Sequence, residues 1–111
     1  MSVSEISVEE LSAGLEETSA DQIRLVDVRE TDEYISGHVP GALAAPLSSL
    51  PDHVGLFADD AVTYVICQAG GRSMRACEYL SSLGKQVVNV TGGTGAWIAS
   101  GREVVLGESP R

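Results

Sequence analysis

A cysteine, two adjacent glycines and an arginine follow one another closely in the middle of the chain. Cys67 comes directly before a segment that consists of Gln68, Ala69, Gly70, Gly71, Arg72 and Ser73. Consecutive glycines let the backbone curl so that its N–H groups point inward and form a nest for an anion. The nest, the positive end of a helix that begins at about Arg72, and the guanidinium itself all favour an ionised thiol. The pattern predicts a thiolate nucleophile at Cys67, with a pKa below the usual value of a cysteine.

Three short apolar runs rich in β-branched residues predict the strands that would position this segment. They cover Ile23–Val28, Val62–Cys67 and Gln86–Val90, and the middle run is apolar enough for a strand buried on both faces. In an open α/β sheet, ligands bind outside the carboxyl ends of the strands. Cys67, at the end of the middle run, would lie at that place.

The residues after the two glycines have the spacing of a helix. Small or apolar side chains recur at intervals of three and four over Arg72–Leu83, and Gly84 is a suitable stop. The stripe that packs on the sheet consists of Ser73, Ala76, Cys77, Leu80 and Leu83. Cys77 is therefore interpreted as a core residue. A disulfide with Cys67 is not expected, because Cys77 lies roughly 7.5 Å into the helix.

Start and stop signals predict three further helices. Ser7 and Glu10 form the S-x-x-E pattern of a capping box, so one helix should begin at about Val8. Two shorter helices are predicted at residues 30–36, from Thr31 or Asp32 to a stop at Gly37, and at Leu47–Val54.

Strands that alternate with helices indicate an α/β fold. We expect one domain over residues 1–111, with a mostly parallel central sheet and helices on both faces. With 111 residues and 43% hydrophobic content, the chain can bury a sizeable core without disulfides or a structural metal. Residues 1–5 and 107–111 are expected to be frayed ends.

The charge balance limits the classes of partner. The net charge of −9 repels nucleic-acid backbones and anionic lipid surfaces, so neither is an expected partner. The apolar runs are far shorter than the ~20 residues that span a bilayer, and the N-terminus lacks the pattern of a secretory signal. The sequence therefore predicts a cytoplasmic protein whose two cysteines are thiols.

Local charge and metal-ligand spacing add two expectations. Residues 61–85 contain Arg72, Arg75 and Lys85 against one acid, Glu78, which hints at a basic island around the nest. No C-x-x-C pair is present and only His38 and His53 are available as histidine ligands, so no metal site is predicted.

Four segments of the chain resemble the single-domain rhodanese family, and they follow one another in the family's order. They are the loop Cys67–Arg72, the segment Asp27–Glu30 with Glu33 and Tyr34, the turn Gly37–Ala42, and the segment Gly92–Trp97. The resemblance implies a rhodanese-like fold and a sulfurtransferase in which Cys67 carries a sulfane sulfur as a persulfide. It implies small sulfur-containing anions as donors, thiols or cyanide as acceptors, and no metal or organic cofactor. A protein partner stays open.

The resemblance also points to supporting residues. Asp27 and Arg29 are expected near the site, and buried ion pairing with the loop or with His38 explains them equally well. His38 is interpreted as a hydrogen-bonded support rather than a general base. Gln68 stands where many rhodaneses have arginine, so the loop has one cation fewer, and a persulfide or polysulfide is a candidate donor in place of thiosulfate.

Two other functions are considered. A non-catalytic rhodanese-like domain would serve in binding or regulation, but such domains typically lose the cysteine that this chain keeps. A cysteine-dependent phosphatase or arsenate reductase uses the same strand, loop and helix. The phosphatases have one residue more between cysteine and arginine than the four found here, and they have histidine where Ile66 stands.

Overall fold

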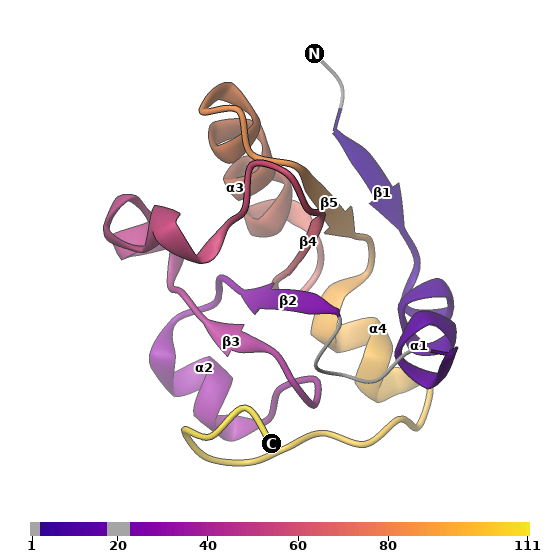
Figure 1. The fold of residues 1–111 in the computed structure, drawn as a ribbon. Helices are drawn as coiled ribbons and strands as arrows, with labels where there is room; N and C mark the ends of the chain where they lie inside the picture. The colour runs from indigo at the N-terminus through magenta and orange to yellow at the C-terminus, as the bar shows by residue number, and fades with distance from the viewer. Residues whose placement is uncertain (1–2, 18–22) are drawn as a thin grey trace.

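The computed structural model describes residues 3–17 and 23–111, and its centre is a parallel five-stranded sheet (Figure 1). The strands lie in the order β1, β5, β4, β2, β3. Their bounds are Ser4–Ile6 for β1, Arg24–Asp27 for β2, Leu43–Ala44 for β3, Thr63–Ile66 for β4 and Val87–Val90 for β5. The predicted α/β class and the predicted parallel sheet are confirmed.

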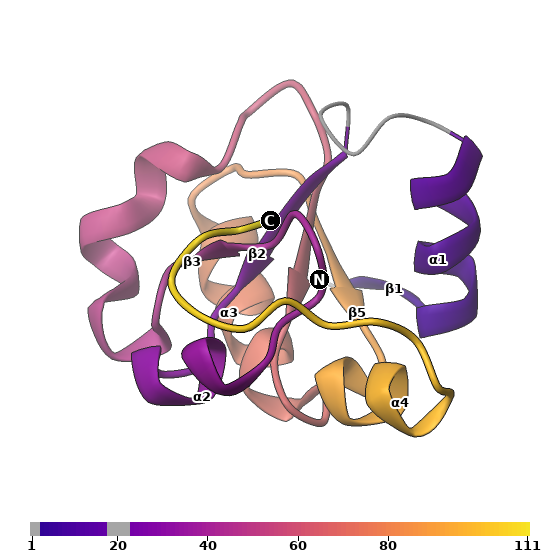
Figure 2. The ribbon, with the colours of Figure 1, turned by 90° about the horizontal axis from the view of Figure 1, so that it is seen from below.

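Helices cover both faces of this sheet (Figures 1 and 2). They are α1 at Val8–Glu17, α2 at Thr31–Ser36, α3 at Gly71–Ser82, α4 at Gly93–Ala99, and the kinked 3-10 helix η2 at Leu47–Leu56. One apolar cluster joins α3 and η2 to the sheet, and a second joins α1, α2 and α4 to the other face. In the described ranges, no helix has the length and apolar character needed to cross a bilayer.

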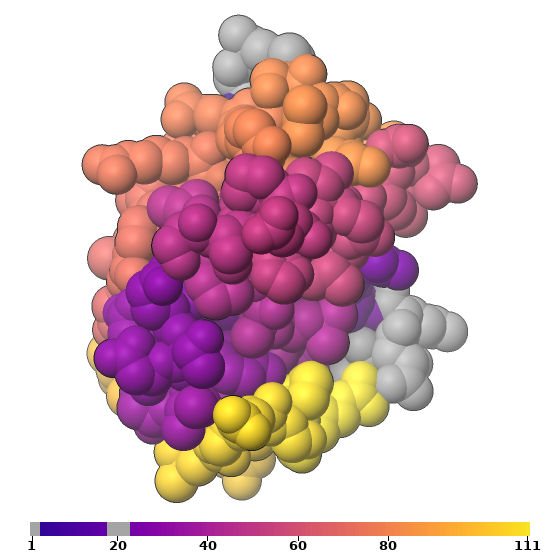
Figure 3. All heavy atoms as spheres, turned by 90° about the vertical axis from the view of Figure 1, so that its left-hand side faces the viewer, coloured from indigo at the N-terminus to yellow at the C-terminus, as the bar shows by residue number. Residues whose placement is uncertain are grey.

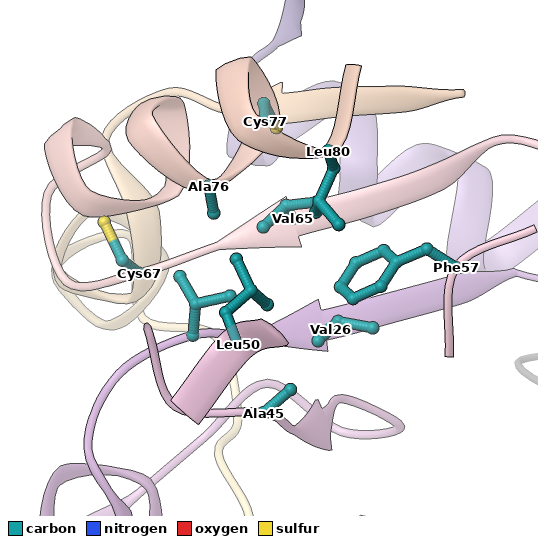
Figure 4. Packing of buried hydrophobic residues seen from close by; sticks show 10 residues of the cluster. Val26, Ala45, Leu50, Phe57, Val65, Cys67, Ala76, Cys77 and Leu80 are labelled. Carbon is teal, nitrogen blue, oxygen red and sulfur yellow. The ribbon is translucent and has the colours of Figure 1, made fainter. Parts of the chain in front are cut away.

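The cluster under α3 runs directly to the predicted nucleophile (Figure 4). Val65 of β4 and Leu80 of α3 are buried in this cluster, and Phe57 lies at the end opposite Cys67. Burial of such side chains is worth roughly 1.5–3 kcal/mol each. The apolar contact between α3 and β4 therefore fixes where the first turn of α3 lies relative to the end of β4.

Capping boxes form at the N-termini of two helices, α1 and α2. The Ser7 hydroxyl accepts the N–H of Glu10 at 3.1 Å, the Glu10 carboxylate accepts the N–H of Ser7 at 3.1 Å, and α1 begins at Val8 as predicted. The helix α2 begins at Thr31, one of the two predicted starts, Thr31 and Asp32. Its capping residue is Glu30, because Glu30 and Glu33 form a capping box of their own.

Three elements were not predicted from the sequence. β1 and β3 have three and two residues, and they form only because β5 and β2 offer unpaired backbone groups at the edges of the sheet. The segment of α4 contains Gly93 and Gly95, which are poor helix formers, so it gave no helical signal. Leu83, predicted on the buried stripe of α3, is 47% exposed because the helix ends at Ser82.

Residues near both ends of the chain form main-chain hydrogen bonds with the domain, and the fraying of residues 1–5 and 107–111 stays a prediction. At the N-terminus, Ser4–Ile6 pairs with β5, while residues 1 and 2 lie outside the described residues. At the C-terminus, the Gly107 N–H donates to the carbonyl of Ile35 at 2.8 Å, and the Pro110 carbonyl accepts the N–H of Gly41 at 2.9 Å. The yellow tail in Figure 3 lies against the violet residues near α2. Main-chain hydrogen bonds to the body of the domain therefore hold this segment.

Candidate active site

The carboxyl ends of the central strands bring the candidate site together. Asp27 of β2 is paired with Ile66 of β4, and Val65 of β4 is paired with Asn89 of β5. Cys67 follows β4 directly, so it lies at the centre of this edge, with its side chain beside the first turn of α3 (Figure 4). The strand ends thus place the loop Cys67–Ser73 where ligands bind in parallel sheets.

The sulfur of Cys67 is surrounded by hydrogen-bond donors of its own loop. The N–H of Gly70 lies 3.1 Å from Sγ, the N–H of Ser73 lies 3.2 Å from it, and the Ser73 hydroxyl oxygen lies 3.3 Å from it. Gly70 is the N-cap residue of α3 and has no side chain to accept an N–H of the first turn. The sulfur takes that place, so the cysteine also caps the helix.

These donors decide the ionisation of the thiol. Burial of the sulfur raises its pKa, while the Ser73 hydroxyl and the N–H groups of Ser73, Gly70 and Ala69 lower it. The donors outweigh burial, and the pKa of Cys67 lies below its usual value. The hydrogen bonds of the loop therefore favour the charged form of the thiol.

The thiol is covered rather than presented at the surface. Cys67 is 1% exposed, whereas Gln68, Ala69 and Gly71 of the same loop are exposed. The N–H groups of Gly70 and Ser73 nevertheless point at the sulfur and not at the solvent. The sulfur is therefore enclosed by the loop that donates to it.

Asn89 is a buried polar residue of β5 that forms hydrogen bonds with Ser73 and Gly70 of the loop. Its side-chain oxygen Oδ1 lies 2.5 Å from the Ser73 hydroxyl oxygen. Its Nδ2 donates to the Gly70 carbonyl at 3.3 Å and to the Glu5 carboxylate at 3.0 Å. Sequence reasoning missed Asn89, although one polar residue in the apolar run Val87–Val90 is a signal that could have identified it.

The start of α4 supports the loop from the side. The N–H of Thr94 donates to the Cys67 carbonyl at 2.8 Å, and the N–H of Gly95 donates to the Gln68 carbonyl at 2.9 Å. Gly93 has a φ of +60°, and a Cβ there would lie 2.3 Å from the Cys67 carbonyl oxygen. Because residue 93 is glycine, the start of α4 can lie this close to the Cys67 carbonyl and donate hydrogen bonds to the loop backbone.

Asp27 and Arg29 form a buried ion pair with each other. Arg29 Nη2 lies 2.9 Å from Asp27 Oδ2, and Arg29 Nε lies 3.1 Å from both carboxylate oxygens. Arg29 also donates to the carbonyl of Gly37 at 2.8 Å and to the side-chain oxygen of Gln68 at 3.2 Å. The pair therefore reaches the loop, through Gln68, and not His38.

Arg72 is held by a carboxylate from another part of the chain. Its Nη1 and Nη2 lie 2.7 Å and 2.9 Å from the two carboxylate oxygens of Glu33 in α2. The hydrogen bond from Arg72 lowers the pKa of Glu33 to about 2, and the same hydrogen bond raises the pKa of Arg72. Arg72 also interacts electrostatically with Cys67, and this adds to the hydrogen bond with Glu33 in raising the pKa of Arg72. Activation of Cys67 by the Arg72 guanidinium stays a prediction.

A family profile described as a rhodanese-like domain matches residues 7–100. The chain belongs to this family. A protein named sulfurtransferase from Allochromatium vinosum is 36% identical over 107 residues, which cover 96% of this chain and 98% of the relative. The resemblance stated from the sequence is thereby confirmed.

Solved structures of rhodanese-like proteins share the fold. A rhodanese-like domain protein from Staphylococcus aureus has a TM-score of 0.84 at 33% identity, covering 94% of this chain and 98% of its own. A rhodanese-related protein from Thermoplasma volcanium has a TM-score of 0.81 at 34% identity, covering 93% of this chain and 98% of its own. The rhodanese-like architecture thus extends over nearly the whole chain.

His38 of the rhodanese-like domain holds the C-terminal tail. Its ring stacks on Tyr34 at 3.7 Å between ring centroids, and Nδ1 lies 2.8 Å from the Tyr34 carbonyl oxygen. Nε2 lies 2.9 Å from the carbonyl oxygen of Ser109. These contacts make His38 a buried structural support.

The second cysteine of the rhodanese-like domain, Cys77, lies on the buried face of α3. Cys77 is fully buried, both cysteines are free, and burial raises the pKa of Cys77 to about 12. Its thiol is neutral at physiological pH, in contrast to Cys67. The packing interpretation of Cys77 agrees with this burial.

Proposed function

We propose that this rhodanese-like domain is a sulfurtransferase that carries a sulfane sulfur on Cys67. A homologue named sulfurtransferase supports a rhodanese-type role in sulfur transfer. The proposal that Cys67 carries the sulfur rests on one observation: the Gly70 N–H, the Ser73 N–H and the Ser73 hydroxyl all converge on its sulfur atom. A thiolate held in this way is a nucleophile.

The proposed first step is an attack of Cys67 Sγ⁻ on the outer sulfur of an anionic donor. A bond forms between the two sulfur atoms, and the bond between the outer sulfur and the rest of the donor breaks. With thiosulfate the bonding pair leaves on sulfite, and Cys67 retains the added sulfur as a persulfide anion. The charges before and after the step are equal, and no external oxidant is needed.

The second step returns the enzyme to its starting state. A thiolate or cyanide attacks the outer sulfur of the persulfide, the sulfur–sulfur bond breaks, and its electron pair returns to Cys67 Sγ. The donors of Gly70 and Ser73 stabilise the anion that leaves in this step. Gln68, Ala69, Gly71 and Arg72 complete the substrate-binding loop of the proposal, with Asp27, Arg29 and His38 as supporting residues.

Intact mass spectrometry tests the proposal directly. After exposure to thiosulfate or to a persulfide donor, we expect the protein to gain the mass of one sulfur atom. Cys67→Ser removes the nucleophile and should abolish the gain, whereas Cys77→Ser keeps it. A wild-type protein that gains no sulfur from either donor contradicts the proposal and leaves a non-catalytic rhodanese-like domain. The cytoplasmic location and the absence of nucleic-acid partners stay predictions from the sequence.

A further inference from the structure

Two guanidinium groups at the loop, those of Arg29 and Arg72, are each paired with a carboxylate. Arg29 and Asp27 are 3% and 0% exposed and form a buried pair. Arg72 and Glu33 are 35% and 32% exposed and form a two-point pair at the surface of the loop. An anion that approaches Cys67 therefore meets cations whose charge is already balanced by protein carboxylates.

Glu33 is fixed in place before any reactant arrives. It belongs to the short helix α2, and its Oε1 accepts the N–H of Glu30 at 3.2 Å, which is half of the capping box of that helix. The same oxygen lies 2.7 Å from Arg72 Nη1. With a pKa of about 2, the Glu33 carboxylate is ionised at neutral pH. Its charge is thus a permanent part of the environment of Arg72.

We propose that Glu33 is a specificity-determining residue that disfavours dianionic sulfur donors by occupying the carboxylate-binding side of Arg72. This inference rests on the proposed function and names the class of donor for the same site. The main-chain N–H groups of Gly70 and Ser73 are dipoles and supply no net charge. They suit a donor that carries one negative charge on its reacting part, whereas a second charge needs a free cation.

Two donors of nearly equal shape isolate this effect. Thiosulfate and methanethiosulfonate both present an outer sulfur bonded to a tetrahedral sulfur, but a methyl group in the second replaces a charged oxygen of the first. Attack by Cys67 Sγ⁻ breaks the same kind of sulfur–sulfur bond in both. Sulfite leaves from thiosulfate and methanesulfinate leaves from methanethiosulfonate, each with the bonding pair, and Cys67 retains the persulfide anion.

The experiment compares kcat/KM for these two donors at pH 7, with cyanide as the acceptor. In Glu33→Gln the side-chain oxygen still accepts hydrogen bonds from the Glu30 N–H and from Arg72 Nη1, whereas an NH2 group replaces the acceptor of Arg72 Nη2 and the charge is lost. We expect the ratio of kcat/KM for thiosulfate to that for methanethiosulfonate to rise about tenfold in this variant. A change in the reactivity of the thiolate affects both donors alike and cancels in the ratio.

Asp32→Asn is the matched control, because Asp32 is an exposed carboxylate on the same turn of α2. We expect its ratio to stay at the wild-type value. The double variant Glu33→Gln/Arg72→Gln should lose the gain of Glu33→Gln, since the proposed effect passes through Arg72. An unchanged ratio in Glu33→Gln, an equal rise in Asp32→Asn, or a gain that survives in the double variant overturns the inference.

Failure of this inference is separable from failure of the proposed function. If intact mass shows that both donors load one sulfur on Cys67 while Glu33→Gln leaves the donor ratio unchanged, only the role of Glu33 is wrong. If neither donor adds sulfur to the wild-type protein, the sulfurtransferase proposal itself is wrong, and the question of donor charge falls with it.

Discussion

Ser73 contacts the sulfur of Cys67 twice, through its main-chain N–H at 3.2 Å and through its hydroxyl oxygen at 3.3 Å. The hydroxyl oxygen also lies 2.5 Å from Asn89 Oδ1. A serine hydroxyl has one hydrogen, so at any moment it donates to the sulfur, to Asn89 or to the Gly70 carbonyl. The ionisation of the nucleophile is therefore coupled to a residue of β5 that does not touch the sulfur.

Ser73→Ala should raise the pKa of Cys67. The substitution removes the hydroxyl donor and leaves the main-chain N–H of residue 73 and that of Gly70, while burial of the sulfur still raises the pKa. The rate of thiol alkylation as a function of pH measures the shift, and its midpoint should move upward. Ser82→Ala, at the other end of α3, is the control and should leave the midpoint in place. A midpoint that moves down in Ser73→Ala refutes this prediction.

Asn89→Ala should have the opposite effect on Cys67. The variant removes the competing acceptor at 2.5 Å, and a thiolate is a stronger acceptor than the Gly70 carbonyl that remains. The alkylation midpoint should therefore fall. Because Glu5 and the Gly70 carbonyl each lose a donor, the free energy of unfolding should drop by about 1–3 kcal/mol. Urea unfolding measures that loss, and an upward shift of the midpoint would contradict the proposed competition.

Gly93→Ala should be more destabilising than Gly101→Ala. Both glycines have positive φ, at +60° and +82°, so each alanine adds backbone strain on the order of 1 kcal/mol. A Cβ at position 101 has nothing within 4 Å, whereas one at position 93 would lie 2.3 Å from the Cys67 carbonyl oxygen. We expect an additional loss of roughly 1–3 kcal/mol in Gly93→Ala by urea unfolding. Equal losses would show that the loop yields freely to the added methyl group.

Glu33 should make stability depend on pH in the acidic range. Its pKa falls from 4.5 to about 2 on folding, chiefly through the hydrogen bond from Arg72. The carboxylate therefore stabilises the fold above pH 4.5, and this contribution is lost as the pH falls through about 2. For a pair with this exposure we expect about 1 kcal/mol at pH 7. Urea unfolding of wild type and Glu33→Gln should show a gap at pH 7 that closes below pH 4.5. A gap that persists at pH 2 contradicts the assignment.

The sequence predicted the elements whose signals are local. The capping box of Ser7 and Glu10 set the start of α1, and the spacing after Gly71 set α3, because both depend on residues within one or two helical turns. The central strands were predicted because β2, β4 and β5 are rich in apolar, β-branched residues. β1 and β3 were not, since their hydrogen bonds come from strands distant in the sequence.

The same contrast holds for the candidate site. Cys67 and its loop were predicted from adjacent residues, since a loop of consecutive glycines before a helix is a local feature. Asn89 and Glu33 were not assigned to the site. They lie 16 and 39 positions away from Ser73 and Arg72, their respective partners, so only the folded chain brings them together.

The sequence by itself determined the α/β class, the strand-to-helix position of Cys67 and the glycines that let its loop curl. Only the tertiary structure decided the charge around that loop. The basic segment of the sequence is balanced by acids from elsewhere, because Arg72 pairs with Glu33 and Lys85 pairs with Asp59 at 2.7 Å. Local structure depends on neighbours along the chain, whereas the field at a site depends on every charge that folding brings within a few ångströms.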